Sequence, residues 1–426
     1  MSRNYAETKT SSTKYWKSKP VMKLDEKIYT SEQINTIDET SRKYKKTEPT
    51  KLPTGYRWKK IDICDDSNMK DVSTFLSTHY RRGTESVYII QYDPDRLRWE
   101  MNNSGYFLTV VDANDSIVGL IGFTYRTVQI FSDQHTMIEP MYMCCEKKYR
   151  KTGIAKVLMD ETIRQSVTYG IDKGVFCDNR IVPKPIATFR QYSRPINYKK
   201  LRENDFVEIG GVEDEIVHNK TKINLKPNRR YVFAENNEQN IDLVYDLYNR
   251  YMDTFSFHMV LSKKDIENYL FNDKYARTYI IMSDPENDET ESNPGKRGSR
   301  ESRPIDFVTY NYYDIINTEN KTSDNVIKAA NVLMYSSNEA RPDVIFINLL
   351  KQLSFDKIHI VYIMDMMHSN KIILSNVKNA DEDTDEEEEN AVYDMNMIKS
   401  NKKIFLNLFN WKCNTFTQNM VSWLLF

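Results

Sequence analysis

Hydrophobic residues in the first half of the chain repeat at two spacings, which predict alternating strands and helices. Apolar residues at every second position are typical of half-buried strands, whereas steps of three and four are typical of helices. Asn114 and Asp115 predict a turn between two strands, and Gly170 predicts the C-terminal cap of a helix. From 52–63 onward strands and helices are expected to alternate, with strands over 106–112, 116–131 and 135–146 and helices over 71–81 and 154–170.

The second half, from about Tyr231, repeats this rhythm. The expected elements are helices over 241–255 and 343–355, strands over 276–284, 305–314 and 357–364, and a helix running into a strand over 325–336. Strands dominate and helices alternate with them, so the pattern predicts an α+β fold with a large mixed sheet. The similar halves suggest a pseudo-duplication, but their sequence identity is too weak to demonstrate a repeat.

The N-terminal 50 residues lack the apolar periodicity of the rest of the chain. Residues 1–14 are interpreted as a disordered tail, and 25–50 as a polar, loosely ordered connection. Between them, 15–24 is expected to be an extended arm, because Pro20 opposes a helix.

Two polar insertions are expected in the second half, near 284–304 and 378–395. The first is rich in Gly, Pro and charge, and the second holds eight acidic residues between Asp381 and Glu389, so both predict solvated surface segments. The expected domain boundaries are 1–50, 51–215 and 216–426.

Composition places the chain among ordinary globular proteins, with 40% hydrophobic and 28% charged residues in 426. Without the acidic insertion the chain is modestly basic, which suits a small anionic partner. There is no long basic stripe with interleaved aromatic residues, so we expect no nucleic-acid partner. There is also no apolar run of about 20 residues and no apolar signal core at the N-terminus, so no membrane span is expected.

The cysteines and histidines predict neither a disulfide framework nor a metal site. Five cysteines are odd in number and show no CxxC spacing, which indicates a reducing compartment and a cytoplasmic protein. Six histidines are scattered, with no HExxH motif. Ser2 stands where N-myristoylation requires glycine, so the chain is not itself a substrate of that modification by motif.

The chain ends on the apolar run NMVSWLLF, which is unusual because frayed tails are mostly polar. One interpretation is a last strand that closes a sheet. The other is that the terminal carboxylate of Phe426 is itself a working group.

A possible phosphate site lies where the strand at 135–146 runs into Arg150-x-x-Gly153-x-Ala155 and a helix. Small residues at the start of a helix let its unpaired N–H groups and its dipole approach a phosphate. The same loop carries additional positive charge at Lys147, Lys148 and Lys151. The alternative is a plain strand–turn–helix connection with a basic rim. Because GxGxxG and GxxxxGK[ST] are absent, a pyrophosphate-linked carrier such as coenzyme A fits better than a dinucleotide or a nucleoside triphosphate.

This strand–loop–helix unit resembles motif A of the GNAT acyltransferases. The resemblance becomes closer with several segments that occur in the order seen in eukaryotic-type glycylpeptide N-myristoyltransferases. They are YWKSKPVMKL, LPTGYRW, IAKVLMDETIRQ, VPKPIATFRQYSRPINYKKL, IDFVTYN, IKAA and FNWKC. The similarity extends over about residues 15–426 apart from the two insertions. It implies two fused GNAT-like halves that form a large, mixed, saddle-shaped sheet flanked by helices.

The resemblance implies transfer of a myristoyl group from myristoyl-CoA, as co-substrate, to the N-terminal glycine of a peptide or protein, with no cofactor and no metal. It implies an N-terminal arm (within 1–50) that contacts CoA, an acyl-CoA-binding half (51–215) and a peptide-binding half (216–426). We expect the protein to be a monomer. The residues that would hold acyl-CoA are Tyr15, Trp16, Arg150, Lys151, Thr152, Gly153, Ile154 and Ala155. An alternative for Tyr15 and Trp16 is an aromatic staple that fixes the arm to the body.

The family mechanism implies three catalytic positions. The backbone N–H groups that match Tyr142 and Met143 would form an oxyanion hole for the thioester. The terminal carboxylate, here that of Phe426, would take a proton from the substrate ammonium, and the free amine would attack the thioester directly. A nucleophilic cysteine is therefore not expected. The positions implied to bind the peptide are Tyr92, Cys177, Asn179, Ser193 and Asp365, the last with a loop cap as an equal alternative.

The chain departs from the family pattern in ways that bear on specificity. Gly153 replaces a second arginine in the phosphate loop, which would weaken the grip on CoA. After Tyr80, Arg81 and Arg82 stand where the family usually has a cluster of acids, so a different peptide preference is expected. Two further functions remain open: an acyltransferase of altered chain or substrate specificity, and a non-catalytic acyl-CoA-binding homologue.

Overall fold

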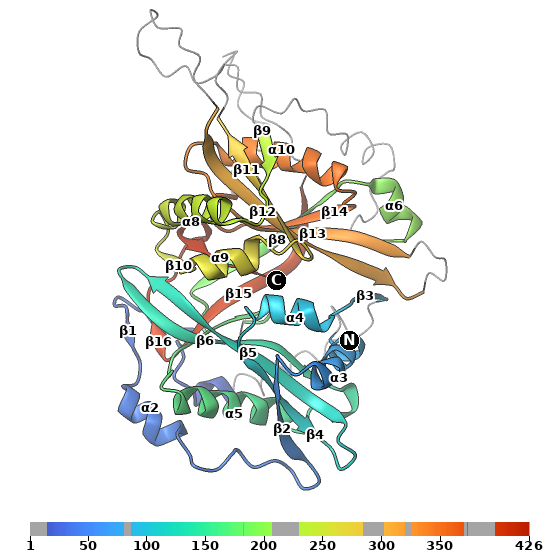
Figure 1. Cartoon of the computed structure of the whole chain (residues 1–426). Coiled ribbons are helices and arrows are strands. Elements are labelled where there is room, and N and C mark those ends of the chain that lie inside the picture. The colour runs from blue at the N-terminus through green and yellow to red at the C-terminus, as the bar shows by residue number, and fades with distance from the viewer. Residues whose placement is uncertain are drawn as a thin grey trace, which may run out of the picture. The chain divides into compact units, whose positions relative to one another are not determined.

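The computed structural model (Figure 1) describes residues 15–80, 87–181, 183–206, 230–283, 302–319, 325–369, 373 and 397–425. The chain divides into two compact units. The first comprises 1–189, 256–260 and 402–417, and the second comprises 190–255, 261–401 and 418–426. The tail at 1–14 and the acidic insertion at 378–395 lie outside the described residues, as does nearly all of the insertion at 284–304.

The first unit is built on a mixed sheet. The four strands β2, β4, β5 and β6 pair antiparallel in that order. β6 is parallel to β7, which is antiparallel to β15. β10 is antiparallel to residues 128–130 of β5, beyond the part of β5 that pairs with β4. The strands of this sheet are β2 Arg57–Asp62, β4 Tyr106–Val111, β5 Ile117–Ile130, β6 Asp133–Cys145, β7 Gly174–Asp178, β10 Phe257–Met259 and β15 Ile398–Phe409. The short strand β3 Tyr88–Ile90 is also in the first unit but pairs with none of these strands.

Helices cover both faces of this sheet, because successive side chains of a strand point to opposite faces and both faces carry apolar residues. Phe107 packs with helices α3 (Asp66–His79) and α4 (Pro94–Glu100), whereas its neighbour Leu108 packs with helix α5 (Ile154–Thr168) on the opposite face (Figure 1). The turn at Asn114–Asp115 is present, with Asp115 at φ 64°, and Gly170 follows α5 at φ 79°, as its expected capping role requires.

The second unit repeats the topology of the first. The strands β9, β11, β12 and β13 pair antiparallel in that order. Next to them, β13 is parallel to β14, and β14 is antiparallel to residues 191–195 of β8. In each unit a helix connects the two parallel strands, α5 in the first and α10 in the second. The strands are β8 Ala187–Pro195, β9 Arg230–Phe233, β11 Ala276–Met282, β12 Pro304–Asn317, β13 Val326–Tyr335, β14 Ile360–Met364 and β17 Val421–Ser422. The helices are α6 Tyr198–Glu203, α8 Glu238–Met252, α9 Lys263–Leu270 and α10 Pro342–Phe355, with the short 3-10 turn η3 at Gln418–Met420. The predicted α+β class with mixed sheets flanked by helices is confirmed.

Three local predictions were wrong. Residues 25–50 are not a loose connection, because they hold strand β1 (Glu32–Gln33), paired with β16 (Trp411–Lys412), and helix α2 (Ile37–Tyr44). α2 opens with a reciprocal capping box: the Thr36 hydroxyl accepts the Glu39 N–H, and the Glu39 carboxylate accepts the Thr36 N–H at 2.8 Å.

The arm at 15–24 is not extended throughout, since residues 15–17 form a helical turn before Pro20. The segment 325–336 contains no helix and is strand β13, because its alternate positions Ile327, Ala329 and Leu333 are buried in the sheet. Cross-strand packing thus overrides the helix propensity of its two alanines. Among the described residues, no helix has the length and hydropathy to cross a bilayer.

Candidate active site

Strands β6 and β7 are paired at only one position of their parallel ladder. The parallel ladder joins Ile138 to Gly174, and the Ile138 N–H donates to the Lys173 carbonyl at 3.0 Å. Backbone N–H groups alternate between the two sides of a strand, so the next one facing β7 would belong to residue 140. That residue is Pro140, which has no N–H. Proline therefore ends the ladder between β6 and β7 at this point.

Strand β6 then makes a bulge. Gly122 pairs with Met141 but Leu120 pairs with Cys144, so Tyr142 and Met143 together oppose a single residue of β5. Tyr142 has φ 55°, the left-handed region that a bulky residue rarely adopts. A bulge interrupts the regular ladder, so the backbone of Tyr142 and Met143 can present N–H groups to a ligand. These are the two residues predicted as the oxyanion hole.

The Tyr142 ring explains how the unusual backbone is held. It is buried, and its centroid lies 5.7 Å from that of Tyr92, 5.9 Å from that of Tyr80 and 6.1 Å from that of Phe107. The contacts with Tyr92 and Tyr80 are edge-to-face and that with Phe107 is tilted, and together they favour one orientation of the ring. Tyr92, predicted to bind the peptide, therefore contacts the residue that forms the bulge.

The basic loop after β6 has the geometry of an anion site. The short 3-10 turn η1 (Lys147–Tyr149) leads to Lys151 and Gly153, which have φ 69° and 94°. The N-cap residue of α5 is Gly153, which has no side chain to accept the first N–H groups of the helix. Ile154 is buried, whereas residues 150–153 and 155 are exposed. All six predicted phosphate-contacting residues, 150–155, thus lie together at the start of α5.

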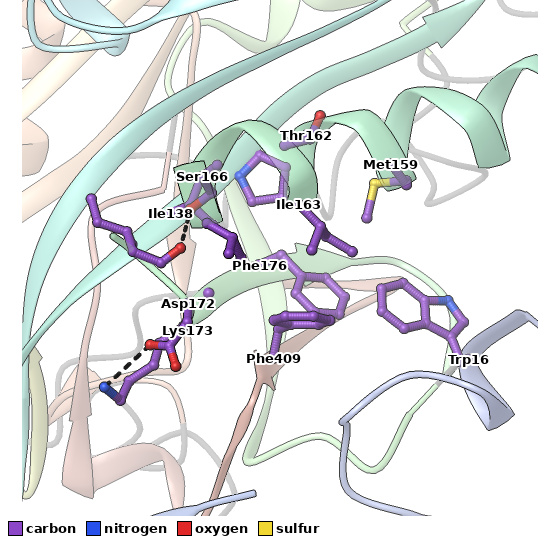
Figure 2. A pocket seen from close by; sticks show the side chains of 14 residues that line it. Trp16, Ile138, Met159, Thr162, Ile163, Ser166, Asp172, Lys173, Phe176 and Phe409 are labelled. Carbon is purple, nitrogen blue, oxygen red and sulfur yellow. Dashed lines mark hydrogen bonds and ion pairs between the residues drawn. The ribbon is translucent and has the colours of Figure 1, made fainter. Parts of the chain in front are cut away.

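A pocket lies against α5, between this helix and strands β6, β7 and β15 (Figure 2). Its empty volume is about 430 Å³, part of it open to solvent. Figure 2 shows the rings of Trp16, Phe176 and Phe409 grouped on one side of it. The other lining residues are Ile138, Pro140, Met159, Thr162, Ile163, Ser166, Val167, Ile171, Asp172, Lys173 and Gly174.

The polar residues of this lining are bonded within the protein. The Thr162 hydroxyl donates to the Leu158 carbonyl at 2.9 Å, and the Ser166 hydroxyl donates to the Ile171 carbonyl at 2.6 Å. The Asp172 carboxylate accepts hydrogen bonds from the Gln33 and Asn410 amides. A polar group that is already satisfied gains little from a ligand, so the pocket presents an essentially apolar surface.

The N-terminal arm lies against α5 and closes one wall of this pocket. Trp16 stacks on Phe176, with ring centroids 5.0 Å apart and planes 9° apart. The Tyr15 hydroxyl donates to Asp160 at 2.9 Å, and Lys19 forms an ion pair with the same carboxylate at 2.5 Å. Burial, with Asp160 nearby, raises the pKa of Tyr15. Tyr15 and Trp16 therefore do fasten the arm to the body, and Trp16 also lines the pocket.

The other predicted peptide-binding residues fall in both units. Cys177 lies at the end of β7 in the first unit and is half-buried, whereas Asn179 directly follows β7 and is exposed. Burial, Glu139 and Asp178 raise the pKa of Cys177. Ser193 is buried on β8 in the second unit. Residues 81–86 lie outside the described part of the chain.

Asp365 shows the geometry of a backbone cap. Its carboxylate accepts the Arg190 N–H at 2.6 Å, and its own N–H donates to the Arg190 carbonyl at 3.0 Å. Burial raises the pKa of Asp365. Both interpretations offered for this residue, a cap and a contact for the substrate amine, remain compatible with these bonds.

The apolar C-terminus is buried in the second unit up to its last residues. Trp423 and Leu424 have exposed fractions of 0% and 2%. The Met367 N–H donates to the carbonyls of Gln418 and Val421 at 3.0 and 3.1 Å, which fastens the segment that precedes them. Phe426 lies outside the described residues.

Sequence reasoning missed a group of buried charges next to the bulge. Arg126 on β5 and Glu139 on β6 form an ion pair at 2.6 Å, and both are buried. The signal was a charged residue in the interior of each strand, Arg126 in β5 and Glu139 in the mostly apolar part of β6. Within the residues that the structure describes, no three His, Cys, Asp or Glu side chains converge as a metal site would require.

Comparisons with known proteins point in one direction. Residues 36–189 match the family described as myristoyl-CoA:protein N-myristoyltransferase, N-terminal domain. The chain is 22% identical to a probable glycylpeptide N-tetradecanoyltransferase of Caenorhabditis elegans over 378 residues, 87% of this chain and 80% of that protein. It is 29% identical to glycylpeptide N-tetradecanoyltransferase 2 of Danio rerio over 45% of this chain and 39% of that protein.

The fold is similar to that of a solved structure. The crystal structure of Saccharomyces cerevisiae N-myristoyltransferase with bound myristoyl-CoA matches 95% of this chain and 94% of its own, with a TM-score of 0.76 and 18% identity.

Proposed function

The chain belongs to the N-myristoyltransferase family, and on this premise we propose that it transfers a myristoyl group from myristoyl-CoA to the N-terminal glycine amine of a protein substrate. The first domain, 51–215, would bind acyl-CoA with help from the arm in 1–50. The second, 216–426, would bind the peptide.

The observation that carries this proposal is the apolar pocket that adjoins the helix with the open N-terminus. A long acyl-CoA is an apolar chain joined to a pyrophosphate, and α5 borders surfaces suited to both. Because the polar groups of the lining are satisfied internally, a hydrocarbon chain leaves none of them unpaired. At ~0.8 kcal/mol per buried CH2, a myristoyl chain could contribute up to ~10 kcal/mol before ordering costs.

The phosphates would lie on the loop 150–155. Left-handed backbone at Lys151 and Gly153 turns the chain so that the free N–H groups at the start of α5 face outward. Those groups, the helix dipole and the Arg150 and Lys151 side chains all favour an anion. Gly153 takes the place of a second arginine, so backbone donors carry a larger share of the binding here.

The thioester carbonyl would lie at the bulge of β6. Its oxygen gains negative charge as the amine attacks, and the backbone N–H groups of Tyr142 and Met143 would stabilise that charge. The Tyr142 ring is held by Tyr80, Tyr92 and Phe107, so these donors are oriented before the substrate binds.

The amine must lose a proton before it attacks, and the terminal carboxylate of Phe426 is the proposed base. In water the α-carboxyl and α-amino pKa values are about 3.5 and 8, a mismatch worth about 6 kcal/mol. An apolar environment raises the first and lowers the second, which narrows the gap from both sides. Trp423 and Leu424, whose side chains are buried, lie three and two residues before Phe426 in the chain. The amine nitrogen then bonds to the acyl carbon, and the CoA thiolate leaves and takes up a proton.

The cysteines near the bulge are poor candidates for an acyl-enzyme. Burial raises the pKa of Cys144 to about 12 and that of Cys145 to about 11. Thiols with such values are almost entirely protonated at neutral pH, and the thiolate is the nucleophilic form. This supports direct transfer from CoA to the amine.

The peptide would contact Tyr92, Cys177, Asn179, Ser193 and Asp365. Arg81 and Arg82 precede Tyr92 in the chain, so the preferred peptide should not be basic after its glycine. We further propose that the protein acts as a monomer in the cytoplasm, since its acyl donor and reduced thiols belong to that compartment.

Mass spectrometry of a glycine-initiated peptide after incubation with the protein and myristoyl-CoA tests the proposal. The expected product carries one myristoyl group on the N-terminal amine, and a peptide with an acetylated N-terminus should remain unmodified. Acylation of a lysine, or faster transfer from acetyl-CoA, would indicate an altered acyltransferase. Tight binding of myristoyl-CoA without any product would indicate a binding protein.

A further inference from the structure

One buried guanidinium joins three elements beside the β6 bulge. Arg126 on β5 donates from Nε to the Glu139 carboxylate at 2.6 Å and from a terminal nitrogen to the Glu100 carbonyl of α4 at 3.2 Å. The same nitrogen lies 3.9 Å from Sδ of Met141, the residue before the bulge. Arg126, Glu100 and Glu139 are all buried.

A second buried pair extends this group along α4. Arg96 donates to the Glu100 carboxylate at 2.7 Å, and the exposed fractions of the two side chains are 6% and 2%. Burial raises the pKa of Glu100 against the opposing effect of Arg96. Four charged side chains are therefore taken out of water next to the segment that would receive the thioester.

Stability alone is a poor explanation for this arrangement. Removing two charges from water costs free energy that their mutual attraction only partly returns, and packed apolar residues are often at least as stabilising. An arginine–carboxylate pair instead fixes the relative orientation of the two segments that carry it, because the planar guanidinium donates hydrogen bonds in only a few directions.

The segment that follows Glu139 has few regular ladder bonds to fix its orientation. The ladder to β7 ends at Ile138, and Pro140 has no N–H to extend it. On the other side, the register with β5 shifts at the bulge. Tyr142 also has φ 55°, a backbone conformation that persists only where the surroundings impose it. Residues 139–141 therefore keep ladder pairing with β5 on one edge only, and residues 142–143 lie in the bulge, so side-chain contacts take a larger part in fixing this segment.

We propose that Arg126 and Glu139 are positioning residues that fix β6 so that the N–H groups of Tyr142 and Met143 point at the thioester oxygen. The inference rests on the proposed function. The Tyr142 ring holds the bulge from one side, and the ion pair holds the strand just before it. Neither Arg126 nor Glu139 takes part in bond making; they act through the backbone donors.

The test combines Glu139→Gln, which keeps the volume but removes the charge, with Glu161→Gln as a matched control. Glu161 is also buried in the first unit, and its carboxylate pairs with Arg164 at 2.7 Å, on α5 rather than on β6. Infrared spectra of bound myristoyl-CoA, isotope-labelled at its thioester carbonyl, report how strongly that oxygen is polarised. Single-turnover transfer, acyl-CoA affinity and the unfolding midpoint are measured on the same samples.

In the wild type the carbonyl band should lie below that of free myristoyl-CoA. In Glu139→Gln it should return toward the free value, and transfer should slow about tenfold, since small misplacements of catalytic groups have large effects on rate. Acyl-CoA affinity should stay within about twofold, because Glu139 itself belongs neither to the phosphate loop nor to the pocket lining. Glu161→Gln should lose comparable stability but keep the wild-type band and rate. Arg126→Lys, which keeps the charge but cannot reach both Glu139 and the Glu100 carbonyl, should be intermediate and serves if Glu139→Gln does not fold.

Wild-type band and rate in Glu139→Gln would overturn the positioning role and leave the proposed function standing. Equal losses in Glu139→Gln and Glu161→Gln would also overturn it, because they would reflect stability alone. An unshifted band in the wild type would overturn both the positioning role and the proposed oxyanion hole.

Discussion

Trp16 lies flat against Phe176, with ring centroids 5.0 Å apart and planes 9° apart, so a residue of the N-terminal arm forms part of the wall of the pocket beside α5. The arm is held at a second point, where the Tyr15 hydroxyl donates to Asp160. Acyl-CoA binding should therefore depend on contacts between the arm and the acyl chain, and not only on contacts between the arm and CoA.

Trp16→Ala should weaken myristoyl-CoA binding at least about tenfold, because it removes a stacked ring and exposes the acyl chain to water. Binding of acetyl-CoA should change much less, since its acyl group does not reach far into the pocket. Isothermal calorimetry with both ligands measures the difference. Tyr15→Phe is the control: it keeps the ring and loses only the bond to Asp160, so its effect should be small for both ligands. If Trp16→Ala weakened the binding of both ligands equally, this would contradict a role for Trp16 in binding the acyl chain.

Gly153 and Gly55 form a natural pair for testing the phosphate loop. Both have positive φ, 94° and 90°, and a Cβ added at either would meet nothing within 4 Å. Alanine at each site should therefore cost about 1 kcal/mol of stability through backbone strain alone. Only Gly153→Ala should also raise the Kd for acyl-CoA, because it alters the turn that presents the N–H groups of α5. Denaturant titration and calorimetry on both variants separate the two effects, and equal acyl-CoA affinities would show that the loop is only a structural turn.

Arg150→Glu should weaken acyl-CoA binding by about tenfold or more, since it places negative charge beside a pyrophosphate at a helix N-terminus. The difference from the wild type should shrink in high salt, which screens exposed charges. Arg57→Glu is a suitable control, because Arg57 is an exposed arginine of the same unit, paired with Asp115 at 2.6 Å. Comparable weakening in both variants would point to net charge and argue against a local site.

The free energy of unfolding should begin to fall at a lower alkaline pH than the ionisation of tyrosine side chains alone would produce. Burial raises the pKa of Cys144 and Cys413 to about 12 and that of Cys145 to about 11, against ~8.5 for an unfolded thiol. The folded state thus binds more protons than the unfolded state above pH ~8.5. The stability that these thiols contribute is complete below that pH and is lost as the pH rises toward 11 to 12. The free energy of unfolding, measured in reductant, should fall by at least about 1 kcal/mol between pH 8 and pH 10.

Cys145→Ser supplies the control for this pH dependence. Serine does not ionise in this range, so the variant should lose less stability than the wild type between pH 8 and pH 10. An identical pH profile in the two proteins would mean that Cys145 titrates normally in the fold.

Long elements with a strong apolar period were predictable from the sequence. Strand 116–131 and helix 154–170 differ from β5 and α5 by at most two residues at each end. Short polar elements were not. Helix α2 has only two apolar residues, Ile37 and Tyr44, on one face, so its clearest sequence signal is the capping pair Thr36 and Glu39. The segment 325–336 was misjudged because the position of an alanine in a sheet depends on its partners, which lie far away in the sequence.

The candidate site could be predicted where it depends on backbone and loop residues. The motif at 150–155 indicated the start of α5, and the resemblance to the family indicated Tyr142 and Met143. The sequence could not indicate that Pro140 ends the β7 ladder, that Tyr142 is left-handed, or that Arg126 reaches Glu139. Each of these features depends on the register between strands, which a single sequence does not determine.

Direct attack of the substrate amine, with the terminal carboxylate as base, is tested most directly by the rate of single-turnover transfer in variants of the C-terminus. Deleting Phe426 moves the carboxylate back by up to ~3.5 Å, and a C-terminal tag replaces it with a neutral amide. Either change should slow the chemical step about 100-fold or more while acyl-CoA binding is retained, because a base must be within hydrogen-bond reach of its proton. Phe426→Leu keeps both the carboxylate and an apolar side chain, and its rate should stay close to that of the wild type. Rates within about threefold of wild type for both the deletion and the tagged protein would contradict the carboxylate as base and leave the apolar end as a closing segment of the fold.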